Sequence, residues 1–246
     1  VKLINFNKST LDPYMNSKNK TSSQNDQDNT ANWAQVKKEL NEKWEKVYTL
    51  SEEHDFRIEF SDAEEVNDDN LKEYVDDIFR ALKMNQISGI KSFNVDFDDC
   101  AQVSNQGFKS LLKLFSSKSL KGVETLSLCF FRCGTIQDDF VKELFTAISE
   151  NIKSVKSVYF SISWNQNVGE NTLKALAEAM ETNAFKNVEY VGLEIYHCKG
   201  LTEQGYKCLL SSMKENCKNL KDARFDFLGC DGIKTSTNKL MEKLGK

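Results

Sequence analysis

An alternating hydrophobic triplet recurs six times along the chain. Each copy has the form apolar-x-apolar-x-apolar, and successive copies begin 37, 33, 32, 33 and 32 residues apart. Alternation with a period of two predicts strands whose alternate side chains face a core. The six triplets are Phe56/Ile58/Phe60, Phe93/Val95/Phe97, Leu126/Leu128/Phe130, Val158/Phe160/Ile162, Val191/Leu193/Ile195 and Ala223/Phe225/Phe227.

A second apolar pattern follows the first five triplets at fixed distances. Positions 15, 18, 19 and 22 after each triplet start are apolar, which is the spacing of one helix face. The sequence therefore predicts a strand, a loop and a helix in each unit, and self-similarity at this period indicates a solenoid. Ankyrin and tetratricopeptide repeats have similar periods, but they need two helices per unit and lack these alternating strands. The helical sets are Leu71/Tyr74/Val75/Ile78, Phe108/Leu111/Leu112/Phe115, Val141/Leu144/Phe145/Ile148, Leu173/Leu176/Ala177/Met180 and Tyr206/Leu209/Leu210/Met213.

The loop between strand and helix carries a column of Cys and Asn. Seven residues after the triplet starts, from the second unit on, lie Cys100, Cys133, Asn165, Cys198 and Cys230. A side chain at such a turn is expected to be buried and to bond backbone groups that no strand reaches.

This column and the segment Val123-x-x-Leu126-x-Leu128 resemble the leucine-rich repeats of the ribonuclease-inhibitor-like class. The strand has a third inward residue and Cys/Asn falls about two places late, as in the longer variant abundant in protist proteins. The resemblance covers residues from about 50 to 246. It implies an α/β horseshoe with a parallel concave sheet and outer helices, built from about six strand-loop-helix repeats.

The ends of the chain depart from the repeat. In the last unit the helical positions read Asn238, Met241, Glu242 and Gly245, which predicts a polar outer face on a terminal repeat. We divide the chain into residues 1–47 and a leucine-rich repeat domain over 48–246. The first part is expected to be an extended polar tail plus an amphipathic helix that either caps the first strand or docks on another subunit. The candidate docking residues are Trp33, Leu40 and Trp44.

Composition favours a cytoplasmic protein without a nucleic-acid or membrane-inserted partner. Lys and Arg number 33 against 37 Asp and Glu, a formal charge of −4, so no global positive field recruits nucleic acid. No apolar run reaches the 18 residues that a membrane span requires. Seven cysteines without a Cys-x-x-Cys pair are expected to be reduced thiols, four of them in the loop column, with no metal bound.

Catalytic motifs are not found in the sequence. The two histidines, His54 and His197, are far apart in the repeat order, and no nucleophile elbow, phosphate-binding loop or zinc-protease motif accompanies them. We therefore expect no enzyme activity, no cofactor and no small-molecule substrate.

The concave sheet face is the predicted site of action. Aromatic residues gather in the later units with charged residues around them, which is typical of a protein-binding hot spot. The candidate partner-binding residues are Phe131, Tyr159, Tyr190, Glu194, Tyr196, Arg224, Asp226 and Leu228.

The expected function is a non-enzymatic protein–protein interaction or scaffold module that forms a subunit of a larger complex. Repeats of this variety are common in cytoskeletal and ciliary assemblies, which makes the cytoskeleton or cilium the expected setting. The alternative is a regulator of a small GTPase, because the resemblance extends to the Ran GTPase-activating proteins.

Overall fold

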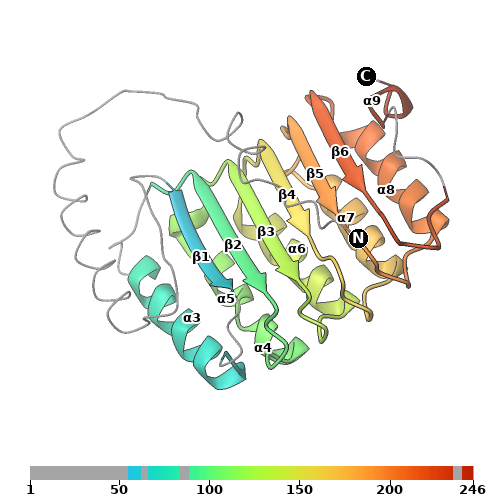
Figure 1. The fold of residues 1–246 in the computed structure, drawn as a ribbon. Coiled ribbons are helices and arrows are strands. Elements are labelled where there is room, and N and C mark those ends of the chain that lie inside the picture. The colour runs from blue at the N-terminus through green and yellow to red at the C-terminus, as the bar shows by residue number, and fades with distance from the viewer. Residues whose placement is uncertain (1–54, 62–65, 84–88, 235–239, 246) are drawn as a thin grey trace.

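The computed structural model describes residues 55–61, 66–83, 89–234 and 240–245. These residues form an α/β fold with one open sheet of six parallel strands in the order β1-β2-β3-β4-β5-β6, and helices alternate with the strands. The strands lie side by side and the helices cover one face of the sheet (Figure 1). The strands are β1 (Asp55–Ser61), β2 (Ser92–Asp98), β3 (Thr125–Phe131), β4 (Ser157–Ser161), β5 (Tyr190–Glu194) and β6 (Asp222–Asp226). The helices are α3 (Asp68–Lys83), α4 (Asn105–Lys109), α5 (Leu112–Phe115), the short 3-10 helix η2 (Lys118–Leu120), α6 (Asp138–Asn151), α7 (Glu170–Met180), α8 (Glu203–Asn216) and α9 (Leu240–Lys243).

The predicted triplets form the sheet side of the core. All six are buried, and the members that lie within the strands pair with their equivalents in neighbouring strands without a register shift. Near-parallel rings stack along the first three strands: Phe97 lies 4.7 Å from Phe60 and 5.8 Å from Phe130 between ring centroids. Helix aromatics meet this row edge-on, as Phe108 does against Phe97 at 5.4 Å. These contacts confirm the predicted strand register.

The Cys/Asn column is buried as predicted and links each unit to the one before it. The Cys133 thiol donates to the carbonyl of Phe97, 3.6 Å away, and the Cys198 thiol donates to that of Ile162 at 3.4 Å. Asn165 donates through Nδ2 to the carbonyls of Phe130, Ile162 and Ser163 at 2.8, 3.0 and 3.1 Å. Burial raises the pKa of Cys198 to about 12, so this thiol keeps the proton that it donates.

A second link between units lies at the start of the helices. An acidic or amide side chain in or next to the first turn accepts a hydrogen bond from the unit that follows. Asp138 Oδ1, for example, accepts from the backbone N–H of Gly169 and from Thr172 Oγ1, both at 2.7 Å. Besides Asp138, the acceptors in this column are Asp68, Asn105, Glu170 and Glu203. The carboxylates among them also interact favourably with the positive end of their own helix.

The helix of the second unit differs from the prediction. Instead of one helix, α4 and α5 are joined by turns in which backbone N–H groups bond three residues back, including Leu111 to Phe108 and Leu114 to Leu111. Three residues per turn bring Phe108, Leu111 and Leu114 into line, so Leu114 is buried while Leu112 is only partly buried. The predicted core position at Leu112 is therefore corrected to Leu114.

The last unit also differs in part. Glu242 and Gly245 are exposed and Met241 is half-buried, which fits the predicted polar face, while Asn238 lies outside the described residues. However, Leu240 at the start of α9 and Leu244 in the turn after it are buried in the core, and the repeat register did not include them. The Leu244 N–H donates to the Leu240 carbonyl, so the two side chains lie four residues apart on one side of the terminal turn.

Candidate interaction surface

The sheet face opposite the helices presents the alternate residues of the six strands. The strand register arranges them in rows that run across the sheet. From β2 to β6, the first three rows read Ser92/Thr125/Ser157/Tyr190/Asp222, Asn94/Ser127/Tyr159/Gly192/Arg224 and Asp96/Cys129/Ser161/Glu194/Asp226. A fourth row, where β4 to β6 have ended, reads Asp98/Phe131/Ser163/Tyr196/Leu228. We call this surface the exposed sheet face.

Negative charge is concentrated on this face. Its strand positions carry seven carboxylates and two guanidinium groups, an excess of five negative charges, whereas the whole chain has a formal net charge of −4. The carboxylates lie at the two flanks, on β1 and β2 and on β5 and β6, and the middle strands β3 and β4 carry no charged residue on this face. The acidic residues are Asp55, Glu59, Asp96, Asp98, Glu194, Asp222 and Asp226, and the basic ones are Arg57 and Arg224.

The edge at the amino ends of the strands is neutralised by contrast. Residues of alternating sign lie there, and Glu124 bridges Lys91 at 3.2 Å and Lys156 at 2.7 Å. Lys221 pairs with Glu189 at 2.6 Å in the same way. Hydrogen bonds from Lys156 and Lys91 hold the pKa of Glu124 below its ordinary value. The excess of negative charge therefore lies on the exposed sheet face and not at the amino ends of the strands.

Tyr159 lies along the sheet rather than standing away from it. Its ring passes over Gly192, where an added Cβ would come within 2.9 Å of Cδ2, and its hydroxyl donates to Glu194 Oε2 at 2.7 Å. Burial, with the nearby Glu194 carboxylate, raises the pKa of Tyr159, and burial and Glu194 also raise that of Tyr196. Tyr159, Tyr190 and Tyr196, which the strand alternation places on the exposed side of the sheet, are each half-buried.

The other predicted residues are spread over the face. Phe131 ends β3, with the Arg132 guanidinium over its ring at 5.7 Å. Arg224 pairs with Asp222 at 3.3 Å, and Asp226 accepts the backbone N–H of Leu228 at 3.1 Å. Leu228 itself is 68% exposed. Ser163, expected to project from the same row, is instead buried, because its Oγ accepts from the Tyr196 N–H at 3.0 Å and donates to the Glu194 carbonyl at 3.1 Å.

Sequence reasoning missed one prominent residue, Trp164, whose side chain is 43% exposed. It packs against His197 at the carboxyl edge of the sheet, with ring centroids 4.1 Å apart and ring planes tilted by 35°. Both residues fall six places after a triplet start, directly before the Cys/Asn column. That fixed place in the repeat was a signal that could have found them. The predicted docking residues Trp33, Leu40 and Trp44 lie outside the described residues.

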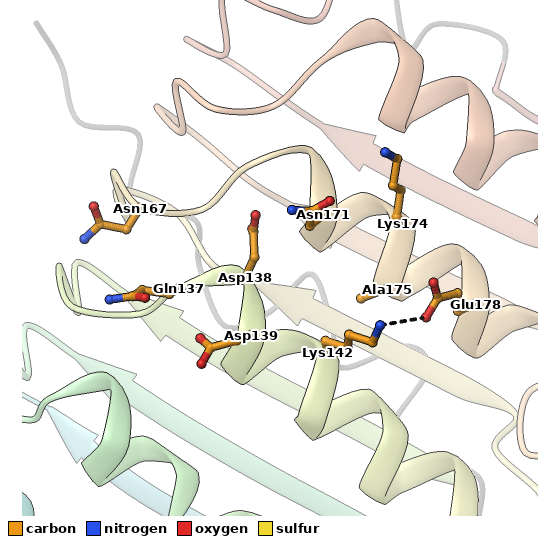
Figure 2. A pocket seen from close by; sticks show the side chains of 9 residues that line it. All are labelled: Gln137, Asp138, Asp139, Lys142, Asn167, Asn171, Lys174, Ala175 and Glu178. Atoms are coloured by element: carbon orange, nitrogen blue, oxygen red, sulfur yellow. Dashed lines mark ion pairs between the residues drawn. The ribbon is translucent and has the colours of Figure 1, made fainter.

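A separate hollow of about 590 Å³ opens between the amino-terminal halves of α6 and α7 (Figure 2). Its charged groups already have partners in the helix layer: Lys142 faces Glu178 at 3.9 Å, Lys174 pairs with Glu170 at 2.5 Å, and Asp138 holds the following unit. The residues that line it are Gln137, Asp138, Asp139, Lys142, Asn167, Asn171, Lys174, Ala175 and Glu178. We assign no chemistry to this hollow.

No protein-family model matches the chain, and no curated protein matches it significantly. None of the described helices combines the length and the apolar composition needed to cross a lipid bilayer. Within the described ranges, no group of three or more His, Cys, Asp and Glu side chains is arranged to hold a metal ion.

Replacing Tyr159 by phenylalanine tests the contact that fixes this ring. The change removes the hydrogen bond to Glu194 and should lower the free energy of unfolding by about 1 kcal/mol, measured by urea denaturation. Since the folded-state pKa is raised, wild type should lose stability relative to the variant as the pH rises above about 10, where an unfolded tyrosine ionises. Ser157→Ala, on the same strand and face, is the control. A Tyr159→Phe effect no larger than this control would show that the bond contributes nothing to stability.

Proposed function

We propose that this chain is a non-enzymatic protein-binding module, a subunit held in a larger assembly, and that the exposed sheet face is its binding surface. The observation that carries the proposal is the concentration of charge and aromatic residues on this one face of the molecule. Charge complementarity steers and orients protein partners, and half-exposed aromatic side chains supply anchors.

The finer fold that we propose is a leucine-rich repeat solenoid in which the exposed sheet face is concave. Three features support it: units of 32 to 37 residues, a buried Cys/Asn column that donates to the preceding unit, and a parallel sheet that stays open. In such an array each unit contacts its neighbours and leaves one extended surface free for a partner.

A binding role fits the chemistry of the described face better than catalysis does. The Tyr159 hydroxyl is held by Glu194, and burial raises the pKa of Tyr159 and of the Cys129 thiol, which keeps both groups protonated at neutral pH. A protonated thiol or phenol is a poor nucleophile or base. We propose a cytoplasmic setting, with the cytoskeleton or cilium as the favoured location, and the tryptophan-containing segment of residues 1–47 as a second attachment.

An affinity capture from native extract, followed by mass spectrometry, tests the proposal. The face variant combines Tyr196→Ala with Leu228→Ser, because Tyr196 is half-buried and Leu228 is exposed, so both changes spare the core. The control variant combines Lys142→Ala with Glu178→Ala on the helix side. We expect the partner captured by wild type to be lost with the face variant and retained with the control.

The opposite result, loss with the control alone, would place the partner on the helix layer and refute the proposal. The rival function, regulation of a small GTPase, is tested by a GTP hydrolysis assay with candidate GTPases. A rate enhancement in that assay would replace the scaffold function with a regulatory one.

A further inference from the structure

The carboxyl edge of the sheet carries a column of residues in the left-handed backbone region. The position six places after the triplet start has a positive φ in five successive units. The residues are Asp99 (φ 53°), Arg132 (55°), Trp164 (64°), His197 (54°) and Gly229 (73°). Glycine adopts this conformation without strain, and Asn and Asp tolerate it, but a bulky aromatic residue such as Trp164 is unfavourable there.

The fold itself does not explain the choice of tryptophan at this position. Gly229 and Asp99 occupy the equivalent place, so the turn forms without a large side chain. The Trp164 side chain is 43% exposed and lies outside the buried core, so its packing contributes little stability to offset the backbone strain. Strained exposed residues of this kind point to function.

The backbone holds this edge rigidly in place. The N–H of Trp164 donates to the Tyr196 carbonyl at 2.8 Å, and the N–H of His197 donates to the Leu228 carbonyl at 2.9 Å. The imidazole of His197 lies where a side chain on Gly229 would be, and its ring packs against Trp164 with the two ring planes tilted by 35°. Trp164 and His197 therefore form a pre-positioned pair of rings. We call these two residues, together with the exposed Leu228 whose carbonyl accepts from His197, the edge ridge.

The rows of the exposed sheet face next to the edge ridge are acidic, whereas at the edge itself Arg132 pairs with Asp99 at 3.1 Å. The third and fourth rows of the exposed sheet face carry Glu59, Asp96, Asp98, Glu194 and Asp226, and no Lys or Arg occupies these rows.

We propose that the edge ridge and the acidic rows together bind a basic, amphipathic segment of a partner protein. Its Lys or Arg side chains face the acidic rows, and an aromatic or branched aliphatic side chain packs on Trp164 and Leu228. From β2 to β6 the strands span about 19 Å, so a helical segment of about 13 residues would cover them. This inference rests on the proposed function and adds the chemistry of the partner.

Selection of phage-displayed 16-residue random peptides on the immobilised full chain tests the proposal. We expect the enriched peptides to carry net positive charge and at least one Trp, Phe or Leu. Affinity is then measured by fluorescence anisotropy with synthetic copies of the enriched peptides. Trp164→Asn should weaken binding about thirtyfold, as loss of an aromatic anchor does. Asp96→Asn combined with Asp98→Asn should weaken binding and reduce its dependence on salt.

A stability measurement separates binding from folding. Asn accepts the left-handed conformation, so the thermal midpoint of Trp164→Asn should not fall by more than a few degrees. If this variant does unfold, Leu228→Ser on the 68% exposed neighbour serves in its place. Lys142→Ala with Glu178→Ala, on the helix layer, is the matched control and should bind like wild type.

Different failures point to different errors. Enriched peptides that are neutral or acidic, but that still lose affinity in the face variant Tyr196→Ala with Leu228→Ser, would overturn the basic partner and leave the proposed function standing. Both proposals would be overturned if the control substitutions on the helix layer weakened peptide binding and the substitutions on the face and the edge ridge did not. Absence of any enriched peptide would also count against both.

Discussion

Replacing Phe97 by alanine should lower the free energy of unfolding by about 3–5 kcal/mol, measured by urea denaturation. Phe97 is fully buried, stacks between Phe60 and Phe130, and meets Phe108 edge-on. Truncation removes these ring contacts and leaves a cavity in the middle of three units, where stacked neighbours on both sides limit collapse.

Ser127→Ala is the control for this prediction. Ser127 alternates with the core residues of β3 on the exposed sheet face, so its loss should cost under about 0.5 kcal/mol. Similar destabilisation by the two changes would mean that the strand faces are assigned the wrong way round.

Replacing Asn165 by aspartate should destabilise the fold by about 3–5 kcal/mol, although the two side chains have nearly the same shape. Asn165 is fully buried, and its Nδ2 is the donor to three backbone carbonyls. A carboxylate would face those carbonyl oxygens with no proton to give. Its pKa would therefore be raised in the folded state, and the loss of stability should shrink as the pH falls and the acid becomes protonated.

Asn165→Cys is the informative comparison. Cys133 and Cys198 fill the equivalent site in the neighbouring units and each donates to two carbonyls, so the cysteine variant should cost under about 1.5 kcal/mol. Denaturant titrations of both variants at neutral pH give the comparison. An aspartate variant as stable as the cysteine variant would refute the role of this column as a hydrogen-bond donor.

The repeating part of the fold could be predicted from the sequence because it depends on local periodicity. The inward triplets and the Cys/Asn column recur at fixed distances, because each unit buries the same positions against its neighbours. The phase of a helix is less secure. In the second unit, the helix passes so close to the Asp68 side chain that a Cβ at Gly107 would clash with it. The turns that follow are of the 3-10 type, and they place Leu114 rather than Leu112 in the core.

The exposed sheet face could be predicted only in outline. Alternation tells which residues leave the core, but it does not tell how a long side chain lies on the sheet. Tyr159 depends on the absence of a side chain at Gly192, which is 33 residues away, and on a carboxylate at Glu194. Trp164 was not predicted, because its position lies directly before the loop column and belongs to neither the strand pattern nor the helix pattern.

The side-chain links in two columns of the array run in one direction. In the Cys/Asn column and at the helix starts, the later unit supplies the donor and the earlier unit supplies the carbonyl or carboxylate acceptor. A ribosome releases the acceptors first, so each newly made unit meets a neighbour that already presents its bonding groups. At the carboxyl edge the direction is opposite, because the backbone N–H groups of Trp164 and His197 donate to the carbonyls of Tyr196 and Leu228 in the next unit. Each unit therefore offers acceptors to its successor in the two columns and N–H donors at the carboxyl edge. Removal of the last unit would leave unpaired groups of both kinds, so the array needs a terminal element that satisfies both.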